Sequence, residues 1–157
     1  MIRKVLTVVG IFYFKGNKMK LERLFEVKES KLFTVAGEAV SVEGKAFAVK
    51  WSDVEGNPEE YNEDFLAKLR DDLKSLEAKK EFVFIEPVFD KNAGYEQFTA
   101  AMKHCARRIK DCVSVIGFAI PSEILANKAF YIDELSAKHA QYCFFCKEDA
   151  GADIARY

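Results

Sequence analysis

The chain has 157 residues, of which 50% are hydrophobic, with 24 Lys and Arg residues against 25 Asp and Glu residues. Such a composition builds a core without help from a metal or a disulfide, so we expect one α/β domain over residues 1–157. The formal net charge of −1 gives no overall field that would attract nucleic acid, so we predict no nucleic-acid partner.

An apolar run over residues 5–14 follows Arg3 and Lys4 near the start of the chain. It is far shorter than the roughly 20 apolar residues that cross a membrane, so we predict no membrane partner. No small-residue cleavage site follows it, which favours a buried strand over a signal peptide. Alternatively, residues 1–18 form an extension ahead of a start at Met19. We expect a cytoplasmic protein, and the apolar run leaves export as the alternative.

Residues 31–51 show alternating apolar side chains with glycines at the corners. Gly37 and Gly44 separate strand-like runs at residues 32–35, 40–42 and 46–51. Glycine adopts positive φ without steric cost, as the turns of hairpins require. The pattern therefore predicts an antiparallel β meander in this part of the chain.

Units of roughly thirty residues follow the meander, a length typical of strand-helix-strand crossovers. The predicted helices are one capped by Asn57, one with an apolar stripe from Tyr95, and one that contains Ile132. The run that ends at Trp51 and the predicted buried strands over residues 81–88, 113–120 and 142–146 make four strands that alternate with these three helices. Because such crossovers are right-handed, the strands are expected to be parallel. The predicted fold is of the α/β class, with an N-terminal β meander followed by β-α-β-α-β-α-β, either as a reduced, TIM-barrel-like fold or as an open, mainly parallel sheet.

The four cysteines are Cys105, Cys112, Cys143 and Cys146. The last two have the spacing of a metal or redox motif, but residues three apart on a strand face opposite sides of a sheet. Free cysteine is also among the residue types most often found in a core. We therefore expect reduced, buried thiols with no metal site, and no glycine-rich loop indicates a nucleotide cofactor.

Polar side chains collect where the predicted parallel strands end. Ligands bind at that edge in parallel α/β folds, because the loops and helix starts expose side chains there. The candidate substrate-binding residues are Trp51, Glu86, Asp90 and Glu148, and Glu123 follows the third strand. The alternative is that these acids are helix caps or first-turn residues favoured by the helix dipole.

Three stretches of the chain carry the pattern of a known enzyme family. They are LFTVAG followed by VEGKAF within residues 32–47, residues 61–87, and residues 98–123 ending in VIGFAIPSE. In that order they resemble the N-terminal hairpin, the third strand and the fourth strand of family five glycoside hydrolases, the cellulase and mannanase type of (β/α)8 barrel. The resemblance implies a β-linked carbohydrate as substrate or ligand and Glu123 as the general acid/base.

The chain departs from that family at several points. Ser122 stands where the family has Asn, and a complete barrel needs about 200 residues or more. Retaining hydrolysis needs a second carboxylate about 5 Å from the first, and only Glu86 or Glu148 on neighbouring strands could supply it. With no identifiable nucleophile, we expect catalysis to be weak or lost. The alternative is a non-catalytic binding protein or a homo-oligomeric assembly protein, in which a partner covers an exposed sheet edge.

Overall fold

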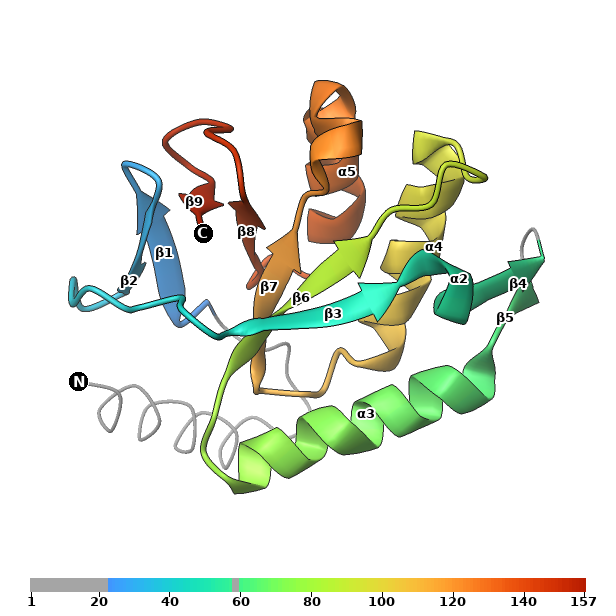
Figure 1. Cartoon of the computed structure of the whole chain (residues 1–157). Helices are drawn as coiled ribbons and strands as arrows, with labels where there is room; N and C mark the ends of the chain where they lie inside the picture. The colour runs from blue at the N-terminus through green and yellow to red at the C-terminus, as the bar shows by residue number, and fades with distance from the viewer. Residues whose placement is uncertain (1–22, 58–59) are drawn as a thin grey trace.

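The computed structural model describes residues 23–57 and 60–157, and its centre is a five-stranded sheet (Figure 1). Neighbouring strands are all parallel, and their order is β3-β6-β7-β8-β9. The strands are β3 (Ala46–Lys50), β6 (Val83–Val88), β7 (Val115–Ala119), β8 (Cys143–Cys146) and β9 (Ala155–Arg156). In the described chain β3 and β9 lie at opposite ends and do not pair, so the sheet is open and no barrel closes. The predicted open, parallel α/β fold is confirmed.

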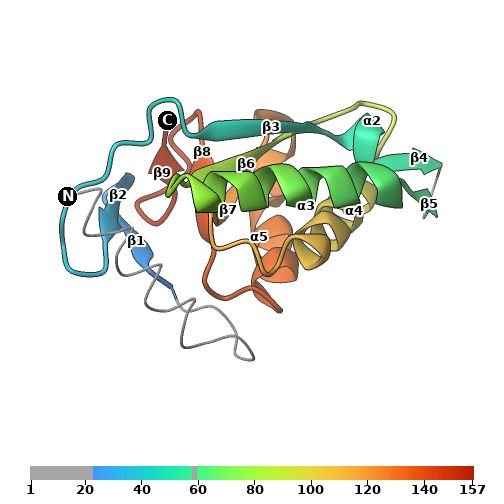
Figure 2. The ribbon, with the colours of Figure 1, turned by 90° about the horizontal axis from the view of Figure 1, so that it is seen from below.

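The helices cover one face of this sheet (Figures 1 and 2). They are α2 (Trp51–Val54), α3 (Glu63–Ala78), α4 (Tyr95–Arg108), η1 (Ser122–Asn127) and α5 (Lys128–Ser136). The strand order in the sheet follows the sequence, and right-handed crossovers that all move in one direction place their helices on the same face. Leu73 of α3, Met102 of α4 and Leu135 of α5 are fully buried in the core on this side.

A hairpin covers part of the opposite face. β1 (Phe25–Lys28) and β2 (Lys31–Thr34) pair antiparallel, and Phe25 packs against the sheet together with Phe84 and Phe145. The rings of Phe84 and Phe145 stack with their centroids 4.1 Å apart. Because the central strands are buried on both faces, they have the continuous apolar sequences that predicted them.

The expected antiparallel meander over residues 31–51 is wrong in part. Residues 40–42 form no strand, and β3 pairs with neither strand of the hairpin. Its parallel pairing with β6 is the one expected of the first of the four parallel strands. The hairpin that does form pairs β2 with β1, and the four-residue sequence of β1 was too short to predict a strand. Alternation shows which side chains face a core, whereas packing elsewhere in the chain selects the partner strand. Gly44, with a φ of +71°, makes the turn that leads into β3.

Helix α3 begins later than expected. Asn62 rather than Asn57 is its N-cap, and the Asn62 side chain accepts a hydrogen bond from the backbone N–H of Phe65 at 3.0 Å. The residues before it form a small antiparallel pair, β4 (Glu55–Asn57) with β5 (Glu60–Tyr61). Asn57 pairs with Glu60 in this hairpin and so cannot cap a helix, whereas two acidic residues follow Asn62 in the first turn, where the helix dipole favours them.

All four cysteines are free and buried. Cys143 belongs to the core under the hairpin and Cys146 to the core under the helices, so the two thiols face opposite sides of β8 as their spacing predicts. Burial raises the pKa of Cys105 to about 12 and that of Cys143 to about 11, which keeps these thiols protonated. Among the described residues, no group of His, Cys, Asp and Glu side chains is arranged to hold a metal ion.

The N-terminal features of the sequence, the apolar run at residues 5–14 and the proposed extension over residues 1–18, lie outside the described residues. Within residues 23–57 and 60–157, each helix is too short or too polar to cross a bilayer.

Candidate functional site

The carboxyl ends of β6, β7 and β8 lie at one edge of the sheet, because these strands run parallel (Figure 1). Glu86 lies near the end of β6, Glu123 follows β7 in η1, and Glu148 follows β8. The chain therefore brings these carboxylates to the same edge from neighbouring strands. Glu123 and Glu148 are exposed, whereas Glu86 is half-buried.

Glu86 is the centre of a polar cluster on the face of the sheet away from the helices. The hydroxyl of Tyr157 donates a hydrogen bond to Oε2 of Glu86 at 2.6 Å, and Nζ of Lys147 lies 3.6 Å from the same oxygen. Phe84 lies in the core under the hairpin, and alternation along β6 places Glu86 on that face as well. Glu86, Lys147 and Tyr157 are termed the Glu86 cluster below.

Electrostatics make Tyr157 a hydrogen-bond donor in this cluster. Burial raises the pKa of Tyr157, and the hydrogen bond to the negatively charged Glu86 raises it further. The phenol therefore keeps its proton across the physiological range and donates a hydrogen bond to Oε2. Within the described chain no hydrogen bond engages the second oxygen of Glu86, Oε1, which leaves an acceptor for a ligand hydroxyl.

Glu123 has a different setting at the same edge. Pro121 ends the strand and Ile124, which is buried, anchors the turn that follows through a hydrogen bond from its N–H to the Pro121 carbonyl at 3.1 Å. The exposed Glu123 side chain forms no hydrogen bond or ion pair with any residue that the structure describes. A carboxyl group in this position can exchange a proton with solvent or with a bound molecule.

Two other predicted site residues have structural roles. Asp90 accepts a hydrogen bond from the N–H of Asn92 at 2.9 Å, which shapes the turn ahead of α4. Trp51 is only 9% exposed, and its indole N–H donates to Oε2 of the buried Glu55 at 3.0 Å. The ring of Trp51 is therefore part of the core and offers no open face on which a sugar could stack.

Sequence reasoning missed two members of the Glu86 cluster. Lys147 directly follows β8, so the rule that selected Glu148, polar residues after a strand, also covers Lys147. Tyr157 follows β9, which has two residues and too little sequence to show any periodicity. No local signal could therefore have placed Tyr157 beside Glu86.

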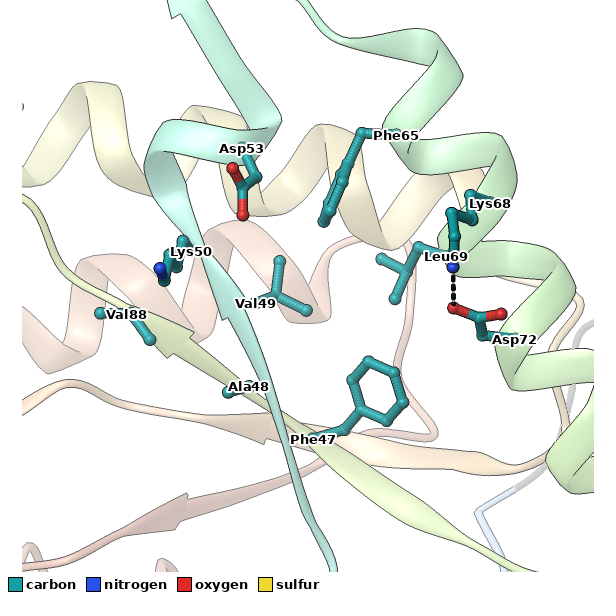
Figure 3. Close-up of a pocket in the computed structure, with 10 residues that line it drawn as sticks. All are labelled: Phe47, Ala48, Val49, Lys50, Asp53, Phe65, Lys68, Leu69, Asp72 and Val88. Carbon is teal, nitrogen blue, oxygen red and sulfur yellow. Dashed lines mark hydrogen bonds and ion pairs between the residues drawn. The ribbon is translucent and has the colours of Figure 1, made fainter.

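A pocket of about 210 Å³ opens at the outer edge of the sheet, between β3 and α3 (Figure 3). Phe47 and Val49 point from β3 toward α3, where Phe65 and Leu69 line the facing wall. The charged residues at this pocket are Lys50, Asp53, Lys68 and Asp72, and the last two form an ion pair of 3.1 Å. The pocket has an apolar floor and a rim that carries both signs of charge.

The chain was compared with protein-family models and with curated proteins. No protein-family model matches the chain, and a search of curated proteins finds no match. The residues and their arrangement are therefore the basis for inferring a function.

Proposed function

We propose that this chain is a glycoside-hydrolase-like domain that binds β-linked carbohydrate at the carboxyl edge of its sheet, with catalysis weak or lost. The observation that carries the proposal is the Glu86 cluster, which lies at the same edge as the exposed Glu123. Its carboxylate, phenol and ammonium groups supply the donors and acceptors that sugar hydroxyls require. The carboxyl edge is also where parallel sheets bind their ligands.

The order of the strands supports this proposal. In a (β/α)8 barrel each strand pairs with the next one in sequence, and the helices form a layer outside the strands. The sheet described here has the same order and a helix layer on one face, although it is open. A shared strand order supports a shared position for the site and not a shared reaction.

The two carboxylates have different proposed roles. Glu123 is the general acid/base, since its free carboxyl group can protonate a glycosidic oxygen and then activate water. Glu86 is the second carboxylate, which Tyr157 and Lys147 hold in one orientation. Oε2 of Glu86 already accepts a hydrogen bond from the phenol of Tyr157, so Glu86 is a weak nucleophile, while its Oε1 is a good acceptor for a sugar hydroxyl. We therefore expect tight orientation of a ligand and slow hydrolysis at most.

Hydrolysis of β-linked glucan and mannan oligosaccharides tests the role of Glu123. The Glu123→Gln variant keeps the size of the side chain but loses the transferable proton, so any activity should fall by about 10²- to 10⁴-fold. Glu81→Gln is the matched control. Glu81 is exposed and precedes β6, so it lies at the opposite edge of the sheet from Glu123. An unchanged rate in Glu123→Gln would remove Glu123 from the acid/base role.

Calorimetric titration with the same oligosaccharides tests binding. Glu86→Gln and Tyr157→Phe should weaken binding because each removes part of the Glu86 cluster, and Glu81→Gln should leave it unchanged. If the wild-type chain neither binds nor cleaves any of these sugars, the carbohydrate proposal is overturned.

A second candidate function is assembly with another copy or partner without catalysis. One observation favours it: β3 is an outer strand, and no described strand pairs with its far side. We also propose a cytoplasmic location for either function, because four free, buried cysteines suit a reducing compartment.

A further inference from the structure

The outer edge of β3 presents unpaired backbone groups. The carbonyl of Lys45 accepts a hydrogen bond from the N–H of Phe84 at 3.0 Å, so this residue turns its backbone toward β6. Backbone groups alternate in direction along a strand, and those of Ala46, Ala48 and Lys50 therefore point outward. No backbone hydrogen bond joins the outward groups of Ala46 and Ala48 to any other part of the described chain. The carbonyl of Lys50, the N-cap of α2, accepts the first hydrogen bond of that helix.

The strand has few of the features by which proteins block an open edge. β3 contains no proline, and its register with β6 continues without a bulge from Ala46 to Lys50. Ala46 and Ala48 are small and exposed, so nothing projects over the edge from them. Lys50, at the end of the strand, is its only charged residue. An edge of this kind is a template for another strand.

The pocket beside β3 indicates what kind of strand fits. An added strand would place every second side chain on the helix side of the sheet, where Phe47, Val49, Phe65 and Leu69 form the apolar floor (Figure 3). The fitting partner is therefore an extended segment with apolar residues at alternate positions and small residues between them.

β3 itself has this sequence, Ala-Phe-Ala-Val-Lys. Antiparallel pairing about a twofold axis at Ala48 sets Ala48 opposite its own copy and Ala46 opposite Lys50 of the second copy. At the axis, the N–H and C=O of Ala48 pair with those of its copy, and next to it the N–H of Lys50 donates to the carbonyl of Ala46 of the second copy. The rim of the pocket carries two Lys and two Asp residues, and the net charge is −1, so two copies meet little repulsion.

We propose that two copies of this chain associate through β3, in antiparallel register about a twofold axis at Ala48, and so join their sheets into one. Such an interface is self-complementary, as twofold symmetry requires. It gives the second candidate function a defined partner and contact, and it is independent of carbohydrate binding at the carboxyl edge.

Sedimentation equilibrium over a range of protein concentrations is the first test. The wild-type chain should form a dimer whose fraction rises with concentration. Ala48→Pro removes the N–H at the twofold axis from both copies, and an outward N–H on an edge strand is one that proline can replace without unfolding the sheet. We expect this variant to keep its circular dichroism spectrum and to sediment as a monomer.

A matched pair of variants at one position tests the register. Ala46→Glu places two Glu-Lys pairs across the interface and should tighten the dimer, whereas Ala46→Lys places two Lys-Lys pairs there and should weaken it. Each change should be about 2- to 30-fold in the dimer dissociation constant, from two cross-strand pairs of the usual strength. Val35→Lys, an exposed residue that is 53% accessible and lies outside β3, is the control and should change nothing.

Three results would overturn the proposal. They are a wild-type chain that stays monomeric at every concentration, a dimer that survives in folded Ala48→Pro, and a shift in the same direction for Ala46→Glu and Ala46→Lys. Oligosaccharide binding measured on the Ala46 variants reports separately on the carbohydrate proposal, since Ala46 pairs with Phe84, whereas Ala48 is the residue that pairs with Glu86.

Discussion

The two outer strands of the main sheet differ, because β9 is held by the hairpin turn and β3 is open. At the β9 end, the hairpin turn holds the edge: the N–H of Arg156 donates to the carbonyl of Ser30 at 2.9 Å, and the N–H of Ser30 donates to the carbonyl of Ala152 at 2.9 Å. At the β3 end, no described segment forms comparable bonds with the outward groups of Ala46 and Ala48. A two-residue strand is thus secured while a regular five-residue strand is left open. The open end is therefore the one at which we propose that a second copy binds.

Truncating one phenylalanine at each end should give the largest contrast. Phe145 is fully buried under the hairpin, and Phe145→Ala should lower the free energy of unfolding by about 3–5 kcal/mol. Phe47 at the open edge is half-buried, so Phe47→Ala should cost roughly 1 kcal/mol. Urea unfolding at low protein concentration measures both values. Equal losses would show that the open end is as well packed as the covered end.

The covered end should also lose stability in alkaline solution. The pKa of Tyr157 is raised in the folded protein, first by burial and then by its hydrogen bond to Glu86. A group with a raised pKa in the folded state contributes its full stabilisation below the unfolded pKa, which is about 10 for tyrosine, and loses it as the pH rises above that value.

Tyr157→Phe should therefore cost roughly 1–3 kcal/mol near neutral pH, because it removes a hydrogen bond to a charged group. The difference in unfolding free energy between the wild-type chain and Tyr157→Phe should shrink as the pH rises above about 10. Urea titrations of both proteins from neutral to alkaline pH measure this difference. A difference that does not change with pH would show that Tyr157 does not titrate in contact with Glu86.

A smaller effect is expected at the turn that holds β9. The hydroxyl of Ser30 donates to the carbonyl of Gly151 at 2.8 Å, so Ser30→Ala should cost about 0.5–1.5 kcal/mol and speed amide exchange at Arg156. Ser30 has a φ of +62°, which alanine tolerates poorly, so Ser30→Gly is the companion variant that removes the hydroxyl without that strain. Slow exchange at Arg156 in both variants would show that the turn does not secure this edge.

Local sequence patterns predicted the central part of the fold well. The strands β6, β7 and β8 are apolar on both faces, and the intervening helices have regular apolar stripes, so both kinds of element could be recognised from one window of sequence. β1 and β9 are short and have no such pattern. The crossover rhythm predicted that β3 is parallel to β6. The antiparallel partner that alternation suggested for β3 does not form, because the partner of a strand depends on contacts with distant residues.

The candidate site was less predictable for the same reason. The position of Glu86, Glu123 and Glu148 at one edge follows from parallel strands alone. The hydrogen bond between Tyr157 and Glu86 joins residues 71 apart in sequence, and only the folded chain reveals it. The burial of Trp51 likewise depends on α2, a helix too short for its pattern to be read from sequence.

Amide hydrogen exchange at low and at high protein concentration tests the open edge most directly. The N–H groups of Phe47 and Val49 face β6 and should be protected at both concentrations. The N–H groups of Ala48 and Lys50 should exchange rapidly in the dilute protein and slowly in the concentrated protein, as the dimer forms. Rapid exchange at Ala48 in concentrated protein would contradict pairing through β3, and slow exchange in dilute protein would show that another part of the same chain already covers this edge.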